Sequence, residues 1–170
     1  MIETRLTVDT PEAMEALGAA IARRLDAGDL VLLNGELGAG KTTLTRGLGA
    51  ELGVRGAVTS PTFVLARTHP RADGLPPLVH VDAYRLGSAT ELDDLDIDFA
   101  ASIVVIEWGA GMLTADDWLQ VDIERPHGGD PLAEAVPRAV TITGHGAKWD
   151  SGPNDSGPNN TGDWLDAARD

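Results

Sequence analysis

The chain has 170 residues, no cysteine and a net charge of −14, from 13 basic and 27 acidic side chains. This length suits one domain with its own core, and the lack of cysteine excludes disulfides and thiolate metal sites. The acidic balance disfavours direct, charge-driven binding of nucleic acid. We find neither a signal-peptide pattern nor an apolar run of about 20 residues, so we expect a soluble cytoplasmic protein with no membrane partner.

The first elements in the chain are a strand and a helix. Polarity alternates from Glu3 to Val8, which predicts an edge strand. Thr10 is a typical helix N-cap, and Pro11 fits the first helical position. Apolar residues then recur at helical spacing, and Gly28 is predicted to close the helix.

A phosphate-binding motif follows. The stretch from Gly35 to Thr42 reads GELGAGKT and matches G-x-x-x-x-G-K-[ST] in full. Lys41 can reach the β- and γ-phosphates of a nucleotide, and the Thr42 hydroxyl can bind Mg²⁺. Asp29 to Asn34 is predicted as the buried strand entering the loop, and Thr42 to Leu52 as the helix leaving it, whose positive end favours an anion. The predicted nucleotide-binding residues here are Glu36, Leu37, Gly38, Ala39, Gly40, Lys41, Thr42 and Thr43.

The middle of the chain mixes strands with loops. Ser60 to Phe63 is a hydroxyl-rich turn, which either senses a γ-phosphate or simply precedes a strand. His69 to Pro77 is predicted as a hairpin connection, and Leu78 to Tyr84 as a strand. Ser88 to Ala101 begins like a helix with a capping box, although its later part is rich in aspartate. The acidic residues between Asp82 and Asp98 form either a solvated surface, a docking face for a basic partner or a source of Mg²⁺ ligands.

Two carboxylates are candidates for the chemistry. Ile103 to Ile106 is the purest apolar run and predicts a central strand buried on both faces. Glu107 follows it, where a Mg²⁺ ligand is expected in such sheets, although an ordinary strand-end carboxylate is the alternative. Asp82 lies within a strand pattern among apolar residues, so it either serves the attacking water or the metal, or pairs with Arg85. Trp108 packs either on the nucleotide or in the core.

The end of the chain adds strands and a tail. Asp117 to Arg125 and Ala139 to Thr143 predict two antiparallel strands. The element order predicts an α/β P-loop NTPase fold, a mixed central sheet with an antiparallel flank, and the loop at the carboxyl ends of the central strands. Residues 1–146 are predicted as the ATPase domain. Residues 147–170, with a duplicated SGPN and few apolar side chains, are predicted as a disordered tail. The four histidines show no metal-ligand spacing.

Five motifs together resemble the bacterial TsaE (YjeE) family, the ATPase subunit of tRNA threonylcarbamoyladenosine biosynthesis. They are GELGAGKTT at 35–43, SPTF at 60–63, HVDAYRL at 80–86, EL at 91–92 and IEW at 106–108. The phosphate loop alone is unspecific, whereas this combination in this order is highly specific.

The resemblance implies a small P-loop NTPase that hydrolyses ATP slowly in isolation. Its implied partners are TsaD and TsaB, which transfer the threonylcarbamoyl group to adenosine 37 of tRNAs reading ANN codons, so tRNA is contacted only indirectly. Lys41 becomes the phosphate clamp, and Thr42 and Glu107 become the Mg²⁺ ligands. Asp82 becomes a residue needed for activity, so the implied catalytic set is Lys41, Asp82 and Glu107. The implied switch and nucleotide neighbours are Ser60, Thr62 and Trp108.

Two alternatives use the same loop. A small-molecule kinase needs an arginine-bearing lid, and past the loop we find no arginine-rich lid, only scattered arginines such as those at 67, 71 and 85. A nucleotide-dependent docking module would hydrolyse ATP only incidentally. Because no obvious arginine of the chain meets the charge that develops during hydrolysis, we expect a low basal activity that rises with the partner complex.

Overall fold

The structure is a computed structural model that describes residues 2–36, 38–54, 56, 58, 66–72, 74–83, 95–107, 116–125 and 137–149. Its elements in chain order are β1 (Ile2–Val8), α1 (Pro11–Ala22), β2 (Leu30–Gly35), α2 (Lys41–Leu52), β3 (Ala66–His69), β4 (Leu78–Asp82), β5 (Ile103–Glu107), β6 (Trp118–Glu124) and β7 (Arg138–His145). Neither helix within these ranges is long and apolar enough to cross a bilayer.

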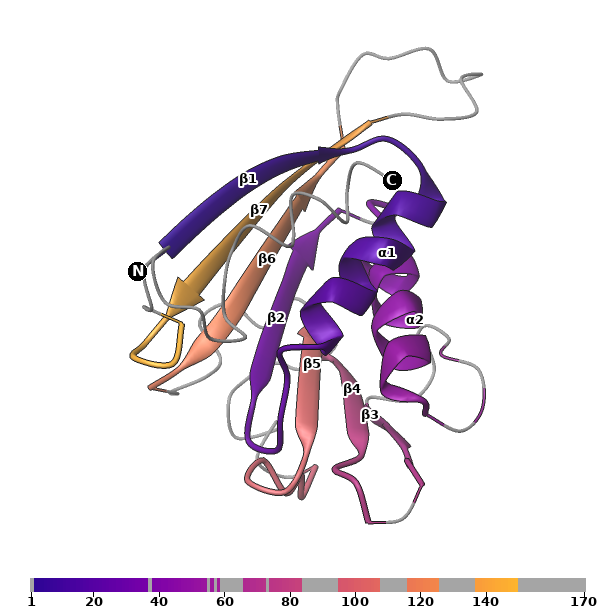
Figure 1. Ribbon diagram of the computed structural model, residues 1–170, viewed down its shortest axis with the longest axis vertical. Helices are drawn as coiled ribbons and strands as arrows, with labels where there is room; N and C mark the ends of the chain where they lie inside the picture. The colour runs from indigo at the N-terminus through magenta and orange to yellow at the C-terminus, as the bar shows by residue number, and fades with distance from the viewer. Residues whose placement is uncertain are drawn as a thin grey trace.

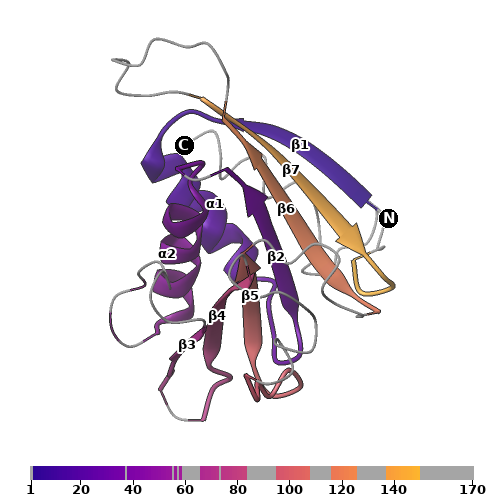
Figure 2. The same ribbon diagram turned by 180° about the vertical axis from the view of Figure 1, so that it is seen from behind.

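The strands form one sheet in the order β1-β7-β6-β2-β5-β4-β3. Its centre, β6-β2-β5-β4, is parallel, whereas β1 and β7 form an antiparallel flank and β3 pairs antiparallel with β4. Figures 1 and 2 show the two sides of this sheet, with β1 and β3 at opposite edges. The predicted mixed sheet, the antiparallel β6–β7 pair and the edge position of β1 are confirmed.

Two helices cover one face of the sheet and lie side by side (Figure 1). The Thr10 hydroxyl accepts a backbone hydrogen bond at 3.1 Å, as its predicted capping role requires. The prediction that α1 runs to Gly28 is wrong, because the helix ends at Ala22. Its end is followed by a turn in which the Asp29 carboxylate accepts the backbone N–H of Asp26 at 2.7 Å, a local bond that competes with helix continuation.

The opposite face of the sheet is partly covered by residues 95–101. The helix expected to begin at Ser88 does not include these residues, which form turns and irregular chain. Apolar side chains recur here at every second position rather than at helical spacing, so they can all face the sheet. Those packed against it are Leu95, Ile97 and Phe99. Asp96 and Asp98 alternate with them and are exposed, so this part of the acidic stretch is a solvated surface.

The last described residues fold back onto the domain after β7. Trp149 is only 6% exposed and packs in the main core, where its Cβ lies close to Gly144. The Lys148 amine pairs with the carboxylate of Asp29 at the start of β2. The ordered part therefore extends at least three residues past the predicted boundary at 146. The rest of the predicted tail lies outside the described residues, so its disorder stays a prediction.

Candidate nucleotide site

The phosphate-binding motif joins β2 to α2 at the carboxyl edge of the parallel strands, as predicted. The first four residues of β2 are buried because the strand lies between β5 and β6. Gly40 forms the N-cap of α2 with φ 117°, a conformation that side-chain-bearing residues rarely adopt. No side chain of the described residues caps this helix end, so its first N–H groups are available to an anion.

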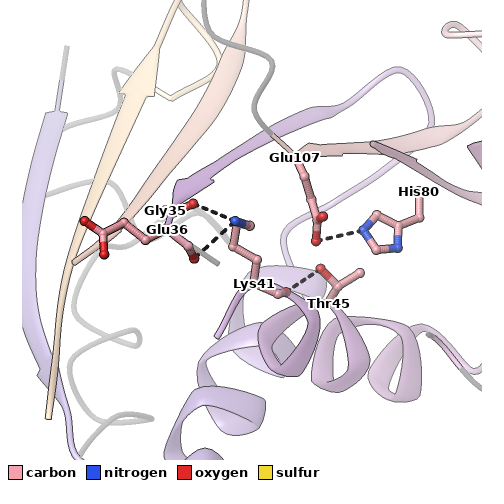
Figure 3. A network of polar contacts seen from close by, with 6 residues as sticks. All are labelled: Gly35, Glu36, Lys41, Thr45, His80 and Glu107. Atoms are coloured by element: carbon pink, nitrogen blue, oxygen red, sulfur yellow. Dashed lines mark hydrogen bonds and ion pairs between the residues drawn. The ribbon is translucent and has the colours of Figure 1, made fainter. Parts of the chain in front are cut away.

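Lys41 is a buried cation at the centre of the site, with 7% of its surface exposed. Its Nζ donates to the carbonyl oxygen of Gly35 at 2.6 Å and to that of Glu36 at 3.4 Å (Figure 3). Burial lowers the pKa of Lys41, and the charges of Glu107 and then Asp82 counteract this by raising it. The ammonium group is therefore supported by two carboxylates from neighbouring strands.

Those carboxylates stand at the carboxyl ends of adjacent parallel strands. Glu107 ends β5 and Asp82 ends β4, and the two residues are direct partners in the strand register. Both are buried, with exposed fractions of 5% and 9%. Both carboxylates act electrostatically on Lys41, and their chemical roles remain predictions. The proposed alternative partner of Asp82, Arg85, lies outside the described residues.

His80 is a residue of the site to which the sequence analysis assigned no role. It is fully buried, and its Nε2 lies 3.3 Å from Oε1 of Glu107. This distance suits an ion pair but the geometry falls short of a hydrogen bond, so Glu107 Oε1 and both ring nitrogens have no hydrogen bond among the described residues. The alternation of a strand could have indicated His80, because it lies two residues before Asp82 and therefore shares a face with it.

The site suits a hard divalent cation that also binds phosphate. A buried carboxylate such as that of Glu107, one oxygen of which has no hydrogen bond among the described residues, is the kind of donor that Mg²⁺ uses. The described residues contain no cluster of three or more acidic or histidine side chains able to hold a metal alone.

Arg138, on β7, lies against the loop and was also missed. Its Nε donates to the carbonyl oxygen of Ala39 at 3.1 Å, and its Nη2 to that of Gly38 at 3.5 Å. Burial lowers the pKa of Arg138, and the charge of Arg125 lowers it further. Arg138 is therefore an arginine at the loop that the sequence analysis did not name, whereas the expectation that no arginine of the chain meets the reacting phosphate stays a prediction. Since 99 residues separate Arg138 from Ala39, no local signal could have indicated the contact.

A small cleft opens beside the loop. Its lining includes Thr10, Met14, Gly40, Thr43 and Arg138. Lys41 and the two carboxylates are not among its lining residues.

Several predicted site residues lie outside the described ones. They are Leu37, Ser60, Thr62 and Trp108. The predicted γ-phosphate switch and the predicted neighbour of the nucleotide thus stay predictions. The other loop residues are described, and Thr42 and Thr43 occupy the first turn of α2.

These features define a P-loop NTPase fold. A glycine loop joins a buried parallel strand to a helix, a lysine stands at the start of that helix, and acids end the adjacent strands. A family model for the threonylcarbamoyl adenosine biosynthesis protein TsaE matches residues 8–130. The chain belongs to the TsaE family, whose members take part in tRNA threonylcarbamoyladenosine biosynthesis.

Individual relatives agree with this assignment. The TsaE protein of Streptomyces coelicolor is 57% identical over 141 residues, which cover 80% of this chain and 93% of that protein. The TsaE protein of Mycobacterium tuberculosis is 50% identical over 115 residues, or 62% of this chain and 68% of its own length. The crystal structure of Bacillus subtilis YdiB has a TM-score of 0.64 and 31% identity, covering 86% of this chain and 89% of that one.

Proposed function

We propose that this chain is the Mg²⁺-dependent ATPase subunit that supports threonylcarbamoylation of adenosine 37 in tRNAs reading ANN codons. It acts on the TsaD–TsaB complex in the cytoplasm and does not itself form the new bond. Family membership supports the pathway, and the phosphate loop supports ATP as substrate.

One observation carries the hydrolytic role. Glu107 and Asp82 are register partners at the ends of β5 and β4, and both act electrostatically on Lys41. Buried carboxylates beside a buried lysine are costly unless they serve a charged ligand or a reaction. Their place at the carboxyl edge, next to the phosphate loop, is where a P-loop enzyme handles metal and water.

Each residue has a defined task in the proposed reaction. Lys41 exchanges its bonds to the loop carbonyls for bonds to phosphate oxygens, and the N–H groups at the start of α2 hold the phosphates. Thr42 and Glu107 would hold Mg²⁺, which would supply positive charge to the reacting phosphates. Asp82 accepts a hydrogen bond from the attacking water and thereby orients it.

We propose that the partner complex supplies a positive charge that accelerates hydrolysis. Arg138 is bound to carbonyl oxygens of the loop, so the positive charge that accelerates hydrolysis is assigned to the partner side. The net charge of −14 disfavours direct contact with tRNA, so the tRNA is reached through TsaD and TsaB.

The variant Glu107→Gln tests the hydrolytic role. It should bind ATP but lose hydrolysis, and a reconstituted TsaD–TsaB system containing it should stop modifying tRNA after few turnovers. The matched control is Glu124→Gln, because Glu124 ends β6 as Glu107 ends β5 but is exposed to solvent. If Glu107→Gln sustained many rounds of modification, the chain would be a nucleotide-dependent docking module instead.

A further inference from the structure

His80 shares one face of the sheet with the two site carboxylates. The β4–β5 register pairs His80 with Val105 and Asp82 with Glu107, so all four side chains point to the same side. That side is the one covered by α2, because Val105 belongs to the core cluster that contains the α2 leucines. Figure 3 shows the Glu107 carboxylate turned toward His80 above the first turns of α2.

The contact between His80 and Glu107 is unusual for a protein core. His80 is fully buried, yet neither of its ring nitrogens has a hydrogen bond among the described residues. Its strand neighbours Leu78, Val79 and Val81 are apolar, so an aliphatic residue at position 80 would suit packing better. A buried polar group that is only partly satisfied calls for a functional explanation.

We propose that His80 is a positioning residue for Glu107. Nε2 of His80, 3.3 Å from Oε1 of Glu107, holds that oxygen by electrostatic attraction, which fixes the carboxylate and leaves Oε2 as the oxygen offered to Mg²⁺. The inference rests on the proposed function, because it assigns Glu107 to the metal. Groups behind a metal ligand act by orienting it, and their removal typically lowers metal affinity about 10- to 100-fold.

The test measures nucleotide binding as a function of Mg²⁺, which does not depend on turnover. His80→Leu should leave the affinity for ADP in EDTA unchanged but raise the half-saturating Mg²⁺ concentration about 10-fold or more. His80→Gln should restore most of the Mg²⁺ response, because its amide nitrogen can reach the place of Nε2. His69→Leu is the matched control, since His69 is also a buried histidine with an unsatisfied Nε2, on the adjacent strand β3. It should leave the Mg²⁺ response unchanged.

A double-mutant cycle separates positioning from general damage. Once Glu107→Gln is present, adding His80→Leu should not change the Mg²⁺ response further, because the two residues act as a unit. Additive effects would overturn the proposal, as would an equal loss of ADP affinity with and without Mg²⁺. If His80→Leu does not fold, the comparison moves to His80→Gln and His80→Asn. Only His80→Gln, with the longer side chain, should keep the Mg²⁺ response of nucleotide binding. Equal Mg²⁺ responses of the two variants would refute the inference.

The same data separate this inference from the function on which it rests. If nucleotide binding by the unaltered chain ignored Mg²⁺, the proposed function itself would fail. If that binding responded to Mg²⁺ but His80→Leu responded identically, only the role of His80 would fail.

Discussion

Lys41, Glu107 and Asp82 depend on one another electrostatically. Burial disfavours the charged form of Lys41, while both carboxylates favour it, Glu107 more than Asp82. The lysine must be protonated to hold phosphate. Removing a carboxylate should therefore affect not only metal binding but also the pH range in which the loop can bind a nucleotide.

The pH dependence of nucleotide binding without metal measures this coupling. Affinity should fall as the pH rises through the pKa of Lys41, which burial has lowered from the ordinary lysine value. In Glu107→Gln this pKa is lower still, so the fall should begin at a lower pH. Titrations of ADP binding in EDTA from about pH 7 to about pH 10 cover the relevant range. A fall at the same or a higher pH in the variant would contradict the described coupling.

Sequence patterns identified those site residues that can be recognised from their neighbours along the chain. The loop motif identified Lys41, and the end of an apolar run identified Glu107. His80 and Arg138 escaped because their contacts are tertiary: His80 meets a residue of β5, and Arg138 meets a loop 99 residues away. The sequence carries no local signal for the Arg138 contact, and for His80 the spacing of β4 indicates only that it shares a face with Asp82.

At the scale of elements, the two helices approach each other through glycines. A side chain at Gly18 of α1 would overlap the backbone carbonyl of Leu44, and one at Gly47 of α2 would overlap that of Glu15. This close packing holds α2, and thus the helix end that follows the phosphate loop, against α1.

The variant Gly47→Ala tests this packing. Alanine is the better helix former by up to about 1 kcal/mol, so intrinsic propensity alone predicts stabilisation. The backbone overlap should outweigh this gain and cost about 1–3 kcal/mol of unfolding free energy, because backbone atoms cannot rotate away. Denaturant unfolding measures the difference. Gly49→Ala is the control, as its closest neighbour is a Val58 methyl group and its loss should be smaller. A stabilised Gly47→Ala would show that α1 and α2 are not tightly packed.

The elements that hold the site follow from local patterns, namely apolar runs and the loop motif. β2, β5 and α2 lie within about one residue of their predicted bounds. The exceptions have physical causes. The Asp29 carboxylate accepts the backbone N–H of Asp26, and the resulting turn ends the helical course before Gly28. At 95–101 apolar residues stand at every second position, which is not the spacing of an amphipathic helix and lets them all pack on the sheet.

At the scale of the whole molecule, the end of the described chain closes the domain opposite the phosphate loop. Trp149 enters the core, and Lys148 reaches the start of β2, 119 residues earlier. Composition predicted only a polar tail here, because one tryptophan and one lysine give no periodic signal. The boundary between domain and predicted tail therefore depends on long-range contacts.

Two shortened chains test where the domain ends. A chain ending at Asp150 should unfold at the same temperature as the full chain, because the removed residues are predicted to be disordered. A chain ending at His145 should unfold at a clearly lower temperature, since losing a buried tryptophan side chain typically costs about 3–5 kcal/mol. Thermal unfolding followed by circular dichroism gives both values. Equal stability of the two shortened chains would show that Trp149 adds nothing to the core.

The most direct test of the account is phosphate release by this chain, measured alone and with purified TsaD and TsaB. We expect slow Mg²⁺-dependent release by the chain alone and a rise of about tenfold or more with both partners, because a positive charge supplied to the reacting phosphate is strongly accelerating. Glu107→Gln should show no release under either condition. A rate unchanged by the partners would contradict the central claim that this is a partner-dependent ATPase.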